Sequence, residues 1–210
     1  MKHLIATTNA VCLLILLSCS GETKSNEIKS ESVIENQNSQ KVNYGAQLVD
    51  AGFLEFADHA KIDSLKLGLE TSFDIFNPAI NKTALIDEEE LAEFNFDFFL
   101  PDLKRILSLR GFTLDVKTGD DYETNYTATI NGVKVQFYGQ EDVEHDNIWK
   151  LASGVFFKEI NSQLKNKKIS ESLYLLYEGN DLQAILLKES EYEIIKQTYK
   201  AIPSEIPYLP

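Results

Sequence analysis

Cysteine is almost missing from this sequence. The only two, Cys12 and Cys19, both lie within the first 19 of 210 residues. Residues 20–210 therefore cannot contain an internal disulfide, a cysteine-ligated metal or a cysteine nucleophile. A hydrophobic core has to hold this part together, and a content of 43% hydrophobic and 25% charged residues is ordinary for a globular protein.

Positive charge is also scarce. The chain has 20 Lys and Arg against 33 Asp and Glu, which gives a formal net charge of −13. Such a surface repels the phosphate backbone, so we expect no nucleic-acid partner. A negative surface keeps a protein soluble, and it also suits a basic protein partner.

Familiar catalytic motifs are missing as well. The sequence has no Gly-x-Ser-x-Gly, no phosphate-binding loop, no His-Glu-x-x-His and no dinucleotide fingerprint. His59 stands alone on an expected helix, and a lone histidine is more often structural than catalytic. We expect no cofactor, and the sequence favours a protein without catalytic activity.

The sequence has no long hydrophobic run, and the apolar run near its start is short. It covers residues 10–17, whereas a membrane-spanning helix needs about 20 apolar residues. A basic start at Lys2, a short apolar centre and a small residue at Ser18 are typical of a signal peptide, here residues 1–18. A buried strand with a core cysteine is the alternative interpretation.

The end of this run, Leu16-Leu17-Ser18-Cys19, resembles the lipobox of bacterial lipoproteins. Leu16, Ser18 and Cys19 match that pattern, while Leu17 stands where a smaller residue is more usual. The resemblance implies cleavage between Ser18 and Cys19, a diacylglyceryl thioether on Cys19, and acylation of the new amino terminus. Several acyl chains anchor a protein far more firmly than one.

The resemblance also implies a location. A lipoprotein of this kind is held in the bacterial cell envelope by the lipid on Cys19, and its partner there is the membrane. Ser20 follows the cysteine where Asp would favour the inner membrane, so the pattern resembles outer-membrane sorting if the source is Gram-negative.

The next segment, residues 19–45, is polar and rich in Ser, Asn, Glu and Lys. With few large apolar side chains it cannot build a core, and we expect a flexible tether. Residues 46–210 then form a single globular domain.

Hydrophobic periodicity and turn signals predict the elements of this domain. Residues 46–60 favour a helix, and 62–76 fit a helix better than a strand without excluding either. Helices are expected after Asp87 and from Pro101 to Gly111, over 148–164 with Asp146 as the cap, and over 191–199 with Ser190 as the cap. Strands are expected at 112–117, 126–130, 133–138, 173–177 and 182–187, and the tail from 202 is expected to be extended coil.

Asn131-Gly132 between two strands is a strong signal for a tight hairpin. Because both strand groups are joined by short turns, the sheet should be largely antiparallel. The sequence thus predicts an α+β fold with a sheet of about five strands and helices packed on it. The expected order from residue 98 is α-β-β-β-α-β-β-α, preceded by helical segments.

One cluster of side chains could carry chemistry. Asp142, Glu144, His145 and Asp146 could bind a hard cation or support acid–base catalysis. The segment is not an EF-hand, because it lacks the required glycine and the final glutamate. A solvated acidic approach to a helix N-terminus explains the same residues, and we favour that interpretation.

Four phenylalanines stand within residues 93–99. Most should pack in the core, but they cannot all face one side of a helix or a strand. Phe94, Phe96 and Phe98 are therefore candidates for an exposed patch that binds a partner.

The sequence leaves three functions open. The first is a lipid-anchored envelope protein with an acidic, non-catalytic, protein-binding domain, of which an immunity-type inhibitor of an envelope toxin is one form. The second is an envelope hydrolase or metal-binding protein that uses Asp142–Asp146. The third is a structural envelope lipoprotein without a tight ligand.

Overall fold

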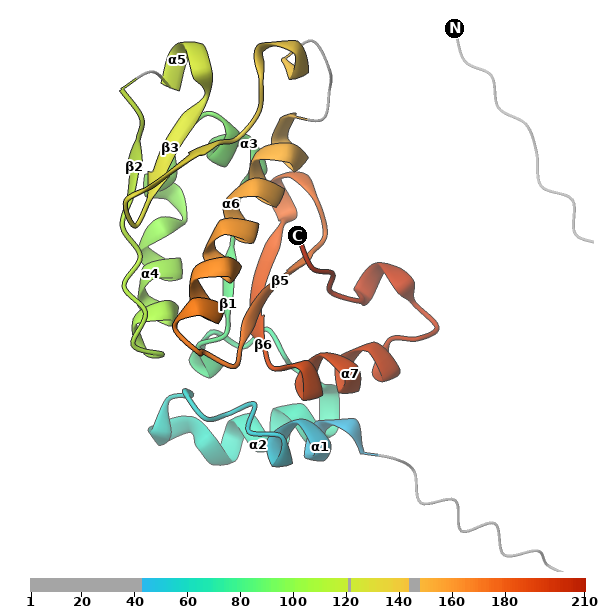
Figure 1. Ribbon diagram of the computed structural model, residues 1–210. Helices are drawn as coiled ribbons and strands as arrows, with labels where there is room; N and C mark the ends of the chain where they lie inside the picture. Colours follow the sequence, from blue (N-terminus) through green and yellow to red (C-terminus); the bar gives the residue numbers. More distant parts are fainter. Residues whose placement is uncertain (1–42, 121, 144–147) are drawn as a thin grey trace, which may run out of the picture. The chain divides into compact units, whose positions relative to one another are not determined.

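The computed structural model of the chain describes residues 43–120, 122–143 and 148–210 (Figure 1). They form an α+β domain, which confirms the expected class. Strands of the first sheet are β1 (Thr83–Leu85), β5 (Ser172–Leu176) and β6 (Gln183–Leu187). Strands of the second sheet are β2 (Val116–Thr118), β3 (Thr127–Ile130) and β4 (Val133–Gln136).

Seven α-helices accompany these strands in the described part of the chain. The helices are α1 (Tyr44–Asp50), α2 (Ile62–Ser72), α3 (Glu88–Ala92), α4 (Leu100–Ser108), α5 (Tyr122–Asn125), α6 (Ile148–Asn166) and α7 (Glu189–Thr198). Single 3-10 turns lie between them, among them η3 (Phe96–Phe98), η4 (Gln140–Asp142), η5 (Gly179–Asp181) and η6 (Pro203–Glu205).

The first sheet has the order β1-β6-β5, is antiparallel throughout and is buried on both faces. One face, with Leu173, Leu175 and Leu186, joins a large core with α3, α4, α6 and the second sheet. The other face, with Tyr174 and Ile185, packs on α1, α2 and α7 in a second core. The sheet therefore separates two hydrophobic layers, and Figure 1 shows α4 and α6 apart from α1, α2 and α7.

The second sheet, β2-β3-β4, is also antiparallel and covers the large core with one face only. Its hairpin turns at Asn131-Gly132 with φ values of +50° and +84°, the positive pair that a type I′ turn needs. Ile130 and Val133 flank the turn as a paired couple. This prediction from the sequence is confirmed.

The structure corrects the expected single sheet of about five strands to two sheets of three strands each. The strand that the sequence did not predict is β1, because its three residues are too few to show an alternating pattern. The expected strand 112–117 begins only at Val116. The loop before β3 contains the one-turn helix α5, which also has too few residues for a helical period.

Several element boundaries also differ from expectation. The helix expected over 46–60 ends at Asp50, and the segment 62–76, which we left open, is helical as α2 up to Ser72. Ser190 does not cap α7: the cap residue is Lys188, whose N–H donates to the Glu191 carboxylate at 2.9 Å. The tail is not simply coil, because it contains η6 and pairs with β5 at Tyr208.

Candidate functional site: an acidic and aromatic surface

Phe94 follows α3 at one end of the domain, in the left-handed conformation with φ of +63°. The N–H of Asn95 donates to the Glu90 carbonyl at 2.8 Å, which closes α3 in the way a glycine usually does. A left-handed aromatic residue costs about 1 kcal/mol or more. This conformation sends the Phe94 ring onto Phe137, and the two rings stack with centroids 5.2 Å apart.

Tyr126 ends α5 in the same way, with φ of +50°. Its ring stacks on that of Tyr138 with centroids 4.4 Å apart. The Tyr126 hydroxyl donates to the Gln140 side chain at 3.1 Å, and the Tyr138 hydroxyl donates to the Ala92 carbonyl at 2.8 Å. These contacts hold α3, α5 and η4 together.

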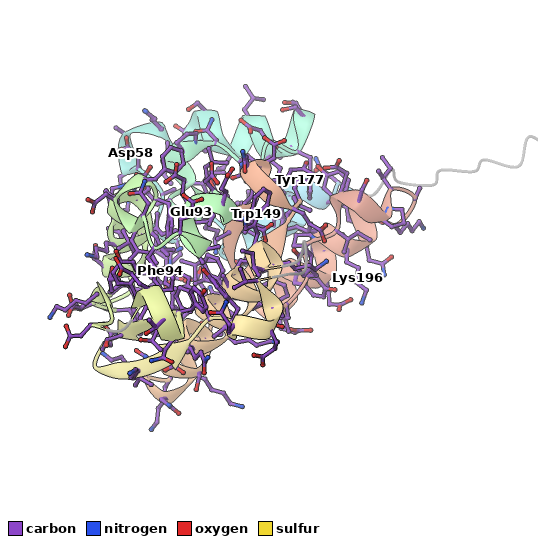
Figure 2. All side chains as sticks on the ribbon, turned by 90° about the horizontal axis from the view of Figure 1, so that it is seen from above. Asp58, Glu93, Phe94, Trp149, Tyr177 and Lys196 are labelled. Carbon is purple, nitrogen blue, oxygen red and sulfur yellow. The ribbon has the colours of Figure 1, made fainter. Side chains whose placement is uncertain are left out.

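Tyr122, on α5, completes the cluster. Its ring lies 5.6 Å from that of Phe94 and 37% of the residue is exposed. Glu93 and Glu123 are exposed beside the rings, and Figure 2 looks down on this end of the domain and labels Glu93 and Phe94. The acidic-aromatic surface, as we call it, comprises Glu93, Phe94, Tyr122, Glu123, Tyr126 and Gln140, and the buried Tyr138 supports it from the core.

The phenols of Tyr122 and Tyr138 stay protonated at neutral pH. Burial, and then the neighbouring Tyr126 and Glu93, raise the pKa of Tyr138. The hydrogen bond to Glu123, and then its charge, raise the pKa of Tyr122. The negative charge therefore resides on the carboxylates, next to aromatic faces. Aromatic faces bind Lys and Arg through cation–π contacts, and carboxylates pair with the same side chains.

The structure separates the three phenylalanines that the sequence grouped. Phe94 lies half-buried in the acidic-aromatic surface. Phe96 is only 6% exposed and stacks on Phe156 in the large core, so it offers no surface to a partner. Phe98 is 57% exposed, and its ring contacts no other aromatic ring among the described residues. Only Phe94 of the three lies in an aromatic surface cluster.

The acidic segment at 142–146 is described only in part. Asp142 accepts a hydrogen bond from the Gly139 N–H at 2.8 Å and so closes η4. Glu144, His145 and Asp146 lie outside the described residues. Among the residues that are described, no three of His, Cys, Asp and Glu are grouped as a metal site.

A second group of ionisable side chains lies deep in the molecule. Lys82 is 1% exposed, and its ammonium donates to Glu171 at 2.5 Å, to Glu191 at 2.9 Å and to the Leu186 carbonyl at 3.1 Å. The Arg110 guanidinium donates to both oxygens of Glu171, at 2.6 and 3.2 Å. Two cations thus balance two carboxylates.

This buried network is structural. Burial alone would raise the pKa of Glu171, but the hydrogen bonds and charges of Arg110 and Lys82 outweigh it and lower that pKa. Both cations also lie over aromatic rings of the segment that follows α1. The Lys82 ammonium is 5.0 Å from the centre of the Phe53 ring, and the Arg110 guanidinium is 4.2 Å from that of Phe56. The network therefore joins the segment after α1 to the first sheet.

Sequence reasoning missed most of the acidic-aromatic surface. Tyr122 and Tyr126 lie at the two ends of α5 and Tyr138 follows β4, and only the folded chain brings them to Phe94. The one available signal was the Tyr-x-x-x-Tyr spacing of 122 and 126 within a polar loop. Ser18 and Cys19 lie outside the described residues.

Within the described residues, none of the helices has the length and apolar character needed to cross a membrane. A comparison of the chain with protein-family models, curated proteins and solved structures finds no match.

Proposed function

We propose that this chain is a lipid-anchored lipoprotein of the bacterial cell envelope whose globular domain binds a basic protein. The observation that carries the anchoring is the run Leu16, Ser18 and Cys19 at the end of a short apolar segment. A polar stretch follows, and the folded domain starts with α1 at Tyr44. Lipid, tether and domain in this order suit a protein held close to a membrane.

The acidic-aromatic surface supports the second half of the proposal. Tyr and Phe rings are enriched where proteins bind each other, and Arg pairs with both rings and carboxylates. Glu93 and Glu123 next to Phe94 and Tyr122 fit such a basic partner, and the net charge of −13 would speed its approach. An immunity-type inhibitor of a basic envelope toxin is one form of this function.

Fractionation of cells tests the anchoring. The full-length chain, expressed in a bacterium that processes lipoproteins, should sediment with membranes, and Cys19→Ser should release it or leave it unprocessed. Cys12→Ser is the matched control, because Cys12 lies inside the predicted signal peptide and should leave sedimentation unchanged. A Cys19→Ser chain that is still cleaved after Ser18 and still sediments fully with membranes would refute the anchor.

Affinity capture from envelope extract tests the binding surface. The wild-type protein should retain a basic protein, identified by mass spectrometry, and the double variant Phe94→Ala, Tyr122→Ala should lose it at least tenfold. Phe98→Ala removes an exposed ring outside the surface and should have no effect. If no captured protein depends on Phe94 and Tyr122, or if the dependent one is acidic, the assignment of this surface is wrong.

A further inference from the structure

The last residues of the chain return to the core and lie along β5 (Figure 1). Leu175 and Tyr208 exchange both backbone hydrogen bonds at 2.8 Å, as a pair of strands does. Two residues earlier on β5, the Asn161 side chain makes the same pair of hydrogen bonds with Leu173. It accepts from the Leu173 N–H at 2.7 Å and donates to the Leu173 carbonyl at 2.8 Å. The outer edge of β5 is therefore occupied, by the Asn161 side chain at Leu173 and by the extended segment around Tyr208 at Leu175.

Beyond Tyr208, the chain leaves two hollows between itself and α6. One is about 390 Å³ and the other about 480 Å³, and Lys158, Leu209 and Pro210 line both. The hollows are thus separated only by the last two residues, and Leu209 is 58% exposed. Together they form a groove beside α6 that Leu209 and Pro210 interrupt.

Three lysines of α6 line this groove: Lys150, Lys158 and Lys165. They are eight and seven residues apart, which is two helical turns each, so they lie on one side of the helix. Between them α6 contributes Gly154, which has no side chain, and Ser162, whose side chain is small, and both leave room. From the first lysine to the last, the groove is about 22 Å long, which is the length of about seven extended residues.

The charge of the groove is opposite to that of the whole chain. Lys150 is paired with Glu178 at 2.5 Å, and that hydrogen bond and charge raise the Lys150 pKa. Lys158 and Lys165 are exposed and make no ion pair with a described residue. Tyr208 stays neutral there, because burial and the charge of Glu88 raise its pKa.

We infer that this lysine groove, lined by Lys150, Lys158 and Lys165, binds an acidic segment of a partner protein in extended conformation. The two hollows lie between α6 and the extended C-terminal segment, beside the β5 edge that this segment fills, and Lys158 and Lys165, which make no ion pair with a described residue, select carboxylates. The groove lies on α6 and β5, whereas the acidic-aromatic surface lies on α3, α5 and η4. The inference therefore does not rest on the proposed function.

Fluorescence anisotropy with the purified full-length protein tests this inference. The probe is a labelled eight-residue peptide that alternates Glu and Thr, and its control alternates Gln and Thr. The Glu peptide should bind at least tenfold more tightly than the Gln peptide, and binding should weaken as salt rises. Equal affinity for the two peptides would overturn the inference.

Two double variants separate charge from folding. Lys158→Gln with Lys165→Gln should weaken binding of the Glu peptide at least tenfold, whereas Lys158→Arg with Lys165→Arg should preserve it. Both should unfold at the wild-type temperature, because these side chains are exposed. Unchanged binding by the Gln variant, or displacement of the peptide by inorganic phosphate at an equal concentration of charged groups, would contradict a peptide groove.

Discussion

Lys82 is the residue on which the buried network depends. It is 1% exposed and donates hydrogen bonds to Glu171 and to Oε2 of Glu191, while Oε1 of Glu191 is buried with no hydrogen-bond partner among the described residues. Removing one partner from a buried ion pair leaves an uncompensated charge, which costs far more than the loss of an exposed pair.

Lys82→Ala should therefore lower the free energy of unfolding by about 3–5 kcal/mol. Lys196→Ala is the control, since Lys196 pairs with Glu193 at 3.1 Å on the surface of α7 (Figure 2). Its loss should cost less than about 1 kcal/mol. Urea unfolding measures the free energy of unfolding of both variants. A similar loss in the two variants would show that the buried network does not stabilise the fold more than a surface ion pair does.

Glu171 should make the stability that the buried network provides sensitive to acid. Its pKa in the folded protein is lowered below the ordinary 4.5, so its contribution to stability is complete above that value. The contribution is lost as pH falls from about 4.5 through the lower, folded pKa. Glu171→Gln cannot titrate, so its free energy of unfolding should be lower at pH 7 and should fall less between pH 5 and pH 3. Parallel curves for both proteins would exclude this role.

The positions of individual side chains were the hardest feature to predict from the sequence. Phe94, Phe96 and Phe98 share an alternating spacing, but the segment is neither a helix nor a strand, because the chain reverses at Phe94 and then enters η3. Lys82 and Glu171 are 89 positions apart, and no local pattern connects them. Tertiary contact alone decides where these side chains lie.

At the level of elements, the hairpin β3–β4 shows how local signals determine a structure. Gly132 has φ of +84° with open space around its Cα, so an added Cβ meets a conformational penalty and no steric contact. Asn131 adds side-chain hydrogen bonds to the Asp115 N–H at 2.6 Å and to Gln163 on α6 at 2.8 Å. The turn therefore also positions β2 and α6.

Gly132→Ala should destabilise the protein by about 1 kcal/mol, because a left-handed residue with a side chain is strained. Gly154→Ala is a matched control with the opposite sign: Gly154 also has open space around it, but it lies inside α6. There alanine should stabilise by about 0.5–1 kcal/mol, since glycine is a poor helix former. Thermal unfolding of both variants checks the pair, and a shift in the same direction for both would contradict it.

The longer elements could be predicted because their patterns are strong. The wide apolar face over 148–164 predicted α6, and the runs 173–177 and 182–187 predicted β5 and β6. The short elements β1 and α5 could not be predicted, because their stability comes from the neighbouring elements. The start of α7 was also missed, since Lys188 caps it through the Glu191 carboxylate and not through a side chain of its own.

At the level of the whole molecule, the two sheets and their two hydrophobic layers were not foreseeable from element order. The sequence predicts which segments pair locally, but β1 and β6, about 100 residues apart, meet only in the folded chain. The same folding places an acidic-aromatic surface on α3 and α5 and a lysine groove on α6 and β5. A domain with surfaces of opposite charge suits the binding of proteins.

We propose that Cys19 becomes the lipid-bearing first residue of the mature protein. Mass spectrometry of the mature chain, purified from membranes with detergent, tests this most directly. We expect an N-terminal peptide that starts at Cys19, lacks residues 1–18 and carries the added mass of a diacylglyceryl group and an acyl chain. A chain that retains Met1–Ser18, or that starts at Cys19 without lipid, would contradict it.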